Sequence, residues 1–278
     1  MACRRFRWIF LGLTLACAAA PAHAQSSNDP ISYIIDQLNP LIPDFKTPPG
    51  LKVRVGAIAG LTPAFEGSED YDFRYAPTLD VIYKDRIFLN STRLRVNFMP
   101  PGEVRGGVQL KYRSGRKEKT SADLAGLGNV SSSLEAGAYI EARLNMVLIS
   151  ADLARDVTSG HKSTLASLLV GHGLYQDKDT LVGTGLQLHW AGGDYMRAFF
   201  GIDPDQSAAS GLPDYSPGAG FKDAGLILYW KQDLSEKVVL QSNISLTELL
   251  NGAKHSPIVR ERGSATQFLS SIGIRYEF

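Results

Sequence analysis

The last eight residues, SIGIRYEF at 271–278, alternate between apolar and polar side chains as far as a terminal phenylalanine. In an extended chain this alternation gives one apolar and one polar face, formed by Ile272, Ile274, Tyr276 and Phe278 against Gly273, Arg275 and Glu277. Chain ends of soluble domains usually fray, so a large apolar last residue is unusual unless a neighbour holds it. The stretch therefore predicts a final strand that is paired along its whole length.

The same period of two recurs throughout the chain. It is clear in LKVRVGAIAGL at 51–61, in EVRGGVQLKYRSG at 103–115 and in KVVLQSNISLTEL at 237–249. Each of these segments has one apolar and one polar face, as half-buried strands do. Twelve such segments are predicted, at 51–65, 72–84, 86–99, 103–114, 133–144, 146–157, 163–175, 180–191, 194–203, 221–233, 237–249 and 267–278.

Alternation alone does not decide which medium meets the apolar face, because a soluble β-sandwich would bury it. Three features favour a membrane: an even strand count, strands of at least the nine to eleven residues that cross a bilayer, and aromatic residues at strand ends. These aromatic residues are Phe65, Phe73, Tyr83, Phe88, Phe98, Tyr112, Tyr175, Trp190, Tyr195, Phe199, Trp230, Tyr276 and Phe278. The predicted fold is an all-β transmembrane antiparallel up-and-down β-barrel of about twelve strands over residues 51–278.

The first 24 residues, MACRRFRWIFLGLTLACAAAPAHA, have the pattern of a secretory signal peptide: arginines, an apolar run, and small residues before a cleavage site after Ala24. A membrane anchor and lipid attachment at Cys17 are the alternatives. Removal of residues 1–24 would take away both cysteines and leave 26 basic and 28 acidic residues. Disulfides, cysteine-based sites and nucleic-acid binding are therefore not expected. The predicted location is the bacterial outer membrane.

Barrel closure explains the apolar end of the chain. In a closed barrel the last strand pairs with the first, so that no open edge is left in lipid. Tyr276 and Phe278 also resemble the C-terminal signal by which bacterial outer-membrane proteins are passed to the insertion machinery. If Phe278 is periplasmic, strand parity places the connections 203–220 and 250–266 outside and 115–132 in the periplasm.

Residues 25–50 differ in composition from the strand region. Ile31, Ile34, Ile35 and Leu38 recur at helical spacing before Pro40, which predicts a short amphipathic helix in the periplasm. This segment could bind a partner, lie on the membrane surface, fill the barrel mouth, or remain a disordered leader.

The polar strand faces carry an excess of basic residues. Eleven basic residues, Lys52, Arg54, Arg74, Arg93, Arg95, Arg105, Lys111, Arg113, Arg143, Lys231 and Arg275, are set against the five acidic residues Asp80, Glu135, Glu141, Asp152 and Glu277. A lumen with this lining would favour anions. The alternative is that the charges pair into networks that fill a closed interior, as in small barrels.

Patterns for catalysis or for metal binding are weak. His161 and Ser163 have the spacing of a lipid hydrolase pair, but they lie in an apparent turn, VTSGHKS, without an assignable acidic partner. His172, His189 and His255 have no neighbour at ligand spacing, and Asp203, Asp205 and Asp214 lack the frame of a calcium loop. We expect no enzyme activity, no metal and no cofactor.

Four segments resemble the MipA/OmpV family, whose founding name means MltA-interacting protein. They are PAFEGSEDYDFRYAP at 63–77, YKDRIFL at 83–89, SAASGLPDYSPGAG at 207–220 and HSPIV at 255–259, and the resemblance spans almost all of 51–278. The signature positions in the two outer connections are Ser210, Gly211, Leu212, Tyr215, Gly218, Gly220, Ser256 and Pro257.

The resemblance implies an outer-membrane barrel that acts as a scaffold between a lytic transglycosylase, which degrades murein, and a penicillin-binding protein, which synthesises it. Other members of the family are described as porins or as surface adhesins, so a small anion-preferring porin and an adhesin are the alternatives. Outer-membrane lipid and the insertion machinery are the further expected partners. A fold shared by a family does not by itself fix the activity of one member.

Overall fold

The computed structural model describes residues 50–100 and 102–278 of the chain. The predictions for the signal peptide at 1–24 and for the amphipathic segment at 25–49 lie outside these residues.

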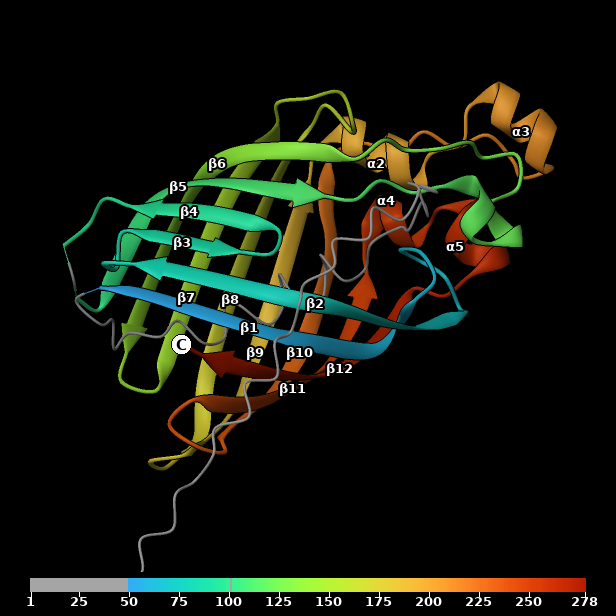
Figure 1. Ribbon diagram of the computed structural model, residues 1–278. Coiled ribbons are helices and arrows are strands. Elements are labelled where there is room, and N and C mark those ends of the chain that lie inside the picture. The colour runs from blue at the N-terminus through green and yellow to red at the C-terminus, as the bar shows by residue number, and fades with distance from the viewer. Residues whose placement is uncertain (1–49, 101) are drawn as a thin grey trace, which may run out of the picture.

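The described chain forms a closed antiparallel barrel of twelve strands (Figure 1). The strands are β1 (Leu51–Pro63), β2 (Tyr71–Tyr83), β3 (Ile87–Asn90), β4 (Arg93–Asn97), β5 (Val104–Arg113), β6 (Ser133–Leu144), β7 (Val147–Asp156), β8 (Thr164–Gln176), β9 (Thr180–Ala191), β10 (Gly220–Asp233), β11 (Val238–Leu249) and β12 (Thr266–Glu277). Each strand pairs with its neighbours in sequence, and β12 pairs with β1. The predicted all-β barrel is confirmed.

The C-terminal strand closes the barrel as its alternation predicted. β12 pairs with β1 from Arg54 opposite Glu277 to Leu61 opposite Ser270, and the amide nitrogen of Phe278 donates to the carbonyl of Val53 at 3.0 Å. The rings of Tyr276 and Phe278 meet edge to face with centroids 5.0 Å apart. The chain end is therefore paired to its last residue.

The apolar faces of the strands point away from the lumen. On β12, Ile272 and Ile274 are 52% and 48% exposed, whereas Leu269 and Ser271, on the other face of the same strand, are buried. The same alternation of exposed apolar and buried polar residues occurs on β5, β6 and β11. A sandwich would bury these leucines and isoleucines, so the sandwich alternative is wrong and the apolar surface is the outside of the barrel.

Exposed aromatic rings lie near both ends of the barrel wall. One rim carries Tyr83, Phe98, Tyr175, Tyr276 and Phe278, and the other carries Phe73, Tyr75, Tyr112, Phe221 and Phe268. Three other rings that the sequence placed at a rim, Phe65, Tyr195 and Phe199, are buried inside the molecule instead. They belong to the connections that cover one end of the barrel.

The predicted strand at 194–203 is wrong, because this segment is the helix α2 (Gly193–Phe200). Tyr195, Met196, Phe199 and Phe200 recur at helical spacing and are all buried, on the face that packs against neighbouring helices. Period two and period 3.6 are hard to distinguish in so short an apolar run.

The predicted single strand at 86–99 is also wrong, because it is a hairpin of two short strands, β3 and β4. The side-chain carbonyl of Asn90 accepts hydrogen bonds from the amides of Thr92 and Arg93 at 3.1 and 2.8 Å, which turns the chain at Ser91–Thr92. The two errors cancel in the strand count, which stays at twelve.

The two ends of the barrel differ in the length of their connections. The short connections 84–86, 98–103, 145–146, 177–179 and 234–237 gather at one end, here called the turn end, together with Leu51 and Phe278. The long connections 64–70, 114–132, 157–163, 192–219 and 250–265 gather at the other, here called the loop end. The connection 115–132 was predicted to lie at the opposite end from 203–220 and 250–266. This prediction is wrong, because the three connections lie at the same end of the barrel. The false strand at 194–203 inverted the predicted side of every connection between residues 98 and 194, and the missed hairpin at 86–99 restored it for the connections before residue 87.

The long connections pack into a cap over the loop end, which includes α2, α3 (Pro204–Ser210), α4 (Asn251–Lys254) and α5 (Pro257–Arg262) (Figure 1). Its apolar core joins connections far apart in sequence, among them Phe65, Leu124, Leu127, Ile202, Leu212 and Ile258. No helix within 50–100 and 102–278 is long and apolar enough to cross a membrane.

Candidate functional site

The signature residues of the long connections 192–219 and 250–265 contribute contacts to the cap. Leu212 belongs to its apolar core, and the Tyr215 hydroxyl donates to the carbonyl of Gly252 at 3.0 Å. The Ser256 hydroxyl donates to the carbonyl of Phe200 at 2.7 Å, and Pro257 begins α5. Gly211 ends α3 with a φ of 77°, a conformation that favours glycine. Ser210 is the last residue of α3, Gly218 lies in the following connection and Gly220 begins β10.

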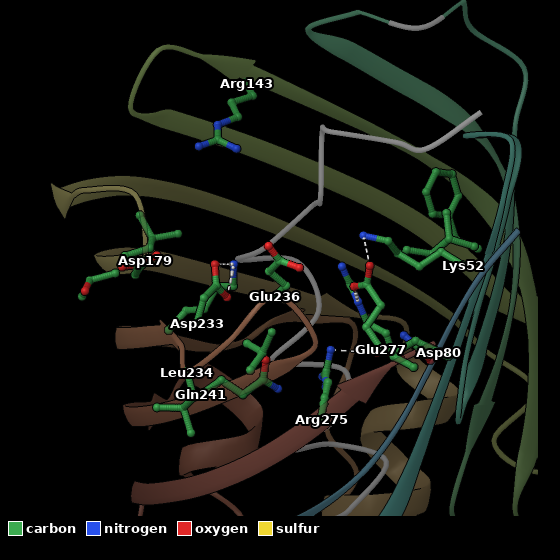
Figure 2. Close-up of a pocket in the computed structure, with 18 of the residues that line it drawn as sticks. Lys52, Asp80, Arg143, Asp179, Asp233, Leu234, Glu236, Gln241, Arg275 and Glu277 are labelled. Atoms are coloured by element: carbon green, nitrogen blue, oxygen red, sulfur yellow. Dashed lines mark hydrogen bonds and ion pairs between the residues drawn. The ribbon is translucent and has the colours of Figure 1, made fainter. Parts of the chain in front are cut away.

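The charged residues predicted for the lumen lie on β1, β2, β4, β5, β6, β7, β10 and β12. Five of them pair near the turn end: Lys52 and Arg54 contact Glu277 at 2.6 and 2.8 Å, and Arg275 contacts Asp80 at 2.8 Å. Figure 2 shows these pairs projecting from the wall into the lumen. These ion pairs join β12, β1 and β2, which are neighbours where the barrel closes.

A second group of ion pairs lies deeper in the lumen. Arg95 pairs with Glu141 and lies over the ring of Tyr139, 4.4 Å from its centroid. Arg105, near the start of β5, pairs instead at the turn end with Asp85 of the 84–86 connection, at 2.6 Å. Deeper in the lumen, Arg93 lies 3.9 Å from Asp152. Lys111 faces inward beside them, opposite Arg93 on β4 and Glu135 on β6. The structure therefore brings the predicted lumen charges together as a network.

The sequence missed several charged residues of the lumen. Asp85 lies in a turn, Glu66 lies in the β1–β2 connection, and Lys222 and Asp223 lie next to each other near the start of β10. A register shift in the pairing of β9 with β10 falls between Phe221 and Asp223, and both Lys222 and Asp223 are buried. In a strand with strict alternation, the side chain of either Lys222 or Asp223 would point outward. These added acids make the basic excess smaller than predicted.

A large cavity of about 680 Å³ occupies the turn-end half of the lumen. Its walls include residues of the 177–179 and 234–237 turns, and Figure 2 shows Asp179, Asp233 and Glu236 across the space from Lys52. The basic lining residues are Lys52, Arg54, Arg93, Arg95, Arg105, Arg143, Lys178, Lys231 and Arg275. The acidic ones are Asp80, Glu141, Asp177, Asp179, Asp233, Glu236 and Glu277.

Two smaller cavities continue toward the loop end. One of about 90 Å³ shares Arg93 and Arg95 with the large cavity. The next, of about 130 Å³, shares Arg113 and Tyr195 with the 90 Å³ cavity. The three spaces therefore follow one another through the barrel, and they are separated first by an arginine pair and then by Arg113 with Tyr195.

Tyr195 of α2 is buried among charged groups at the loop end. Its hydroxyl donates to Glu66 at 2.9 Å, and Glu66 also pairs with Lys222. Burial, with the Glu66 carboxylate beside it, raises the pKa of Tyr195 well above its usual value. The hydroxyl is therefore neutral and acts as the donor of this bond.

His161 and Ser163, which the sequence places in a turn without an assignable acidic partner, are both buried. The ring nitrogen Nε2 of His161 lies 3.0 Å from Glu135, which also pairs with Arg113 at 2.5 Å. The other ring nitrogen, Nδ1, accepts a hydrogen bond from the backbone amide of Ser163 at 3.1 Å. With Nδ1 engaged by the backbone, His161 is not placed to activate the Ser163 hydroxyl as a base would.

No group of three or more histidine, cysteine, aspartate and glutamate side chains with a metal-binding arrangement occurs in the described part of the chain.

Comparison with known proteins gives one family and several distant barrels. The family model described as MltA-interacting protein MipA matches residues 55–278. No curated protein matches the chain. Solved structures that resemble it include the COG4313 outer membrane channel from Pseudomonas putida F1, with 11% identity, a TM-score of 0.43, and coverage of 85% of this chain and 99% of that one. The CymD monoaromatic hydrocarbon channel has 12% identity, a TM-score of 0.43, and coverage of 87% and 92%.

Proposed function

The chain belongs to the family described as MltA-interacting protein MipA, and from this premise we propose that it is a bacterial outer-membrane scaffold for murein enzymes. It would hold a lytic transglycosylase at the inner face of the membrane and, through that enzyme, a penicillin-binding protein. The observation that carries the proposal is the family match, which extends over nearly the whole barrel, from 55 to 278.

The proposed placement follows from the surface of the barrel. Exposed apolar residues cover the outside of the wall and aromatic rings flank them near both ends, as lipid and the two interfaces would require. Outer-membrane barrels have short periplasmic turns and longer outer loops. The turn end, with Leu51 and Phe278, is accordingly assigned to the periplasm, and the cap is assigned to the cell exterior.

This orientation makes the turn end the face that a murein enzyme can reach. Lys178 and Leu234 project there from two neighbouring turns, with the Lys178 side chain 89% exposed and Leu234 56% exposed. The backbone amide of Asp233 donates to the carbonyl of Asp179 at 2.7 Å, so that the two turns form one surface. A protein partner that binds across this surface would bury both side chains.

A double variant, Lys178→Glu with Leu234→Asp, is expected to weaken capture of a purified MltA-type lytic transglycosylase about tenfold, because losing a buried contact of this kind costs on the order of 1.4 kcal/mol. The affinity of the detergent-solubilised barrel for the immobilised enzyme is the measurement. The matched control is Lys254→Glu at the loop end, where the side chain is 49% exposed and should not touch the partner. Absence of binding by the unaltered barrel, or equal weakening by the control, would refute the scaffold assignment.

A second candidate function is that of a small channel, and the three successive cavities favour it. The large cavity has nine basic and seven acidic side chains in its lining, which gives a modest preference for anions. In planar bilayers we expect small conductances with weak anion selectivity.

Replacing Arg93, Arg95 and Arg105 with glutamine is expected to abolish or reverse that selectivity, because only six basic residues would then face seven acidic ones in the cavity. Reversal potentials in a salt gradient are the measurement. The same three positions changed to lysine keep the charge and serve as the control. An unchanged reversal potential in the glutamine variant would contradict the assigned lumen lining.

A further inference from the structure

The helix α2 belongs to the cap and lies at the loop end of the barrel (Figure 1). Its residue Tyr195 is only 1% exposed, and it lines both the 90 Å³ and the 130 Å³ cavities. The Tyr195 side chain therefore lies between these two spaces. The 90 Å³ space is much smaller than the 680 Å³ cavity that it follows, so it is a narrow part of the series of cavities.

Groups from separate parts of the wall surround the Tyr195 ring. His161, from the β7–β8 connection, meets it edge to face at 5.1 Å between centroids. The Arg113 guanidinium of β5 lies 5.6 Å from the ring centroid, and the Lys222 ammonium of β10 lies 5.9 Å from it. Glu66, from the β1–β2 connection, accepts a hydrogen bond from the Tyr195 hydroxyl. One side chain thus closes the space between β5, β10 and two connections.

The attachment of α2 differs from that of the strands. Glycines occur at both ends of the helix: Gly192 precedes it, Gly193 is its first residue and Gly201 follows it. The Tyr195 ring stacks on Phe199 at 4.4 Å, so the two rings belong to one rigid helix face. Two side-chain bonds hold its C-terminal turn to the rest of the protein: Arg116 donates to the carbonyl of Phe199 at 2.6 Å, and Ser256 donates to that of Phe200. Moving α2 would not require any pair of strands to separate.

We propose that Tyr195 is the gate of a solute path through the barrel, and that α2 carries this gate. The path runs from the 680 Å³ cavity past Arg93 and Arg95 into the 90 Å³ space, and then past Tyr195 toward the loop end. The structure holds the gate closed. Small hydrophilic ions are the solutes that such a path fits, since charged side chains line each step. The inference rests on the channel candidate and adds the residue that controls it.

The test is the single-channel conductance of purified barrels with Tyr195→Ala in planar bilayers containing potassium chloride. Removing the ring should join the 90 and 130 Å³ spaces and raise the mean conductance, or the fraction of time open, several-fold. Tyr195→Phe keeps the ring and loses only the bond to Glu66, so it should give an intermediate increase. Tyr215→Phe is the matched control, because it loses one hydroxyl bond inside the cap and does not touch the lumen.

The possible outcomes separate the gate from the channel. Equal conductance in the unaltered protein and in Tyr195→Ala would overturn the gate and leave the channel candidate standing. No current from either protein would overturn both. An increase in the Tyr215→Phe control as large as that in Tyr195→Phe would show general loosening of the cap and would also overturn the gate. Far-ultraviolet circular dichroism on each sample checks that the barrel has folded, and Tyr195→Phe provides the test if the alanine variant fails to fold.

Discussion

Replacing Leu186 with arginine is expected to lower the free energy of unfolding of the barrel in lipid bilayers by about 2–4 kcal/mol, which is the typical cost of an arginine at the bilayer midplane of a barrel. Leu186 lies in the middle of β9 and is 65% exposed on the outer face. Its partners across the two neighbouring strands, Val170 and Leu226, are also exposed apolar residues. An arginine at this position would have to lose its hydration or distort the bilayer.

Reversible unfolding of the barrel in urea, in the presence of lipid vesicles, measures this loss. The effect depends on depth, so Tyr83→Arg at the turn-end rim should cost only about 0–1 kcal/mol from the charge. If Leu186→Arg were as stable as the unaltered protein, the outer face of β9 would not be in hydrocarbon.

Replacing Glu135 with leucine is expected to destabilise the barrel by about 3–5 kcal/mol, because removing one partner of a buried ion pair leaves the other uncompensated. Glu135 is 1% exposed, pairs with Arg113 at 2.5 Å and accepts a hydrogen bond from Nε2 of His161 at 3.0 Å. Its loss would leave the Arg113 guanidinium without this partner in the lumen. The same urea titration measures the change.

The double variant Glu135→Leu with Arg113→Leu provides the control, because it removes both charges of the pair. We expect the double variant to recover a large part of the lost stability, which a double-mutant cycle reports as a coupling energy. Additive losses from the two single variants would mean that the pair contributes nothing to holding the loop end of the lumen together.

The barrel was predictable because most strands have a clean period of two. β12, β11 and β6 alternate along almost their whole length, and the closure between β1 and β12 followed from the apolar end of the chain. The segment YMRAFFG at 195–201 was not predictable, because its apolar residues suit a strand as well as a helix. Its burial against the cap, which involves residues distant in sequence, decides in favour of the helix.

The predicted site depended on the same alternation and failed where the alternation ends. Charges in the middle of strands, such as Arg95 and Glu141, follow the alternation of their strands. Lys222 and Asp223 were missed because the irregular pairing at the start of β10 buries both. Glu66 and Asp85 were missed because they lie in connections, whose side chains do not alternate with a regular period. The proposed gate residue Tyr195 was missed because it lies on a helix within a connection, where the period of two does not apply.

The contact between lipid and the apolar face of each strand can be measured directly with spin labels on β11. The only cysteines of the chain are Cys3 and Cys17, so a protein comprising residues 25–278 permits single cysteines at 244, 245, 246 and 247. Ile244 and Leu246 are 44% and 52% exposed, whereas Ser245 and Thr247 are 2% and 5% exposed. In bilayers, labels at 244 and 246 should collide readily with dissolved oxygen, which concentrates in hydrocarbon, and labels at 245 and 247 should not. Equal oxygen accessibility at all four positions, or the opposite alternation, would contradict the membrane barrel.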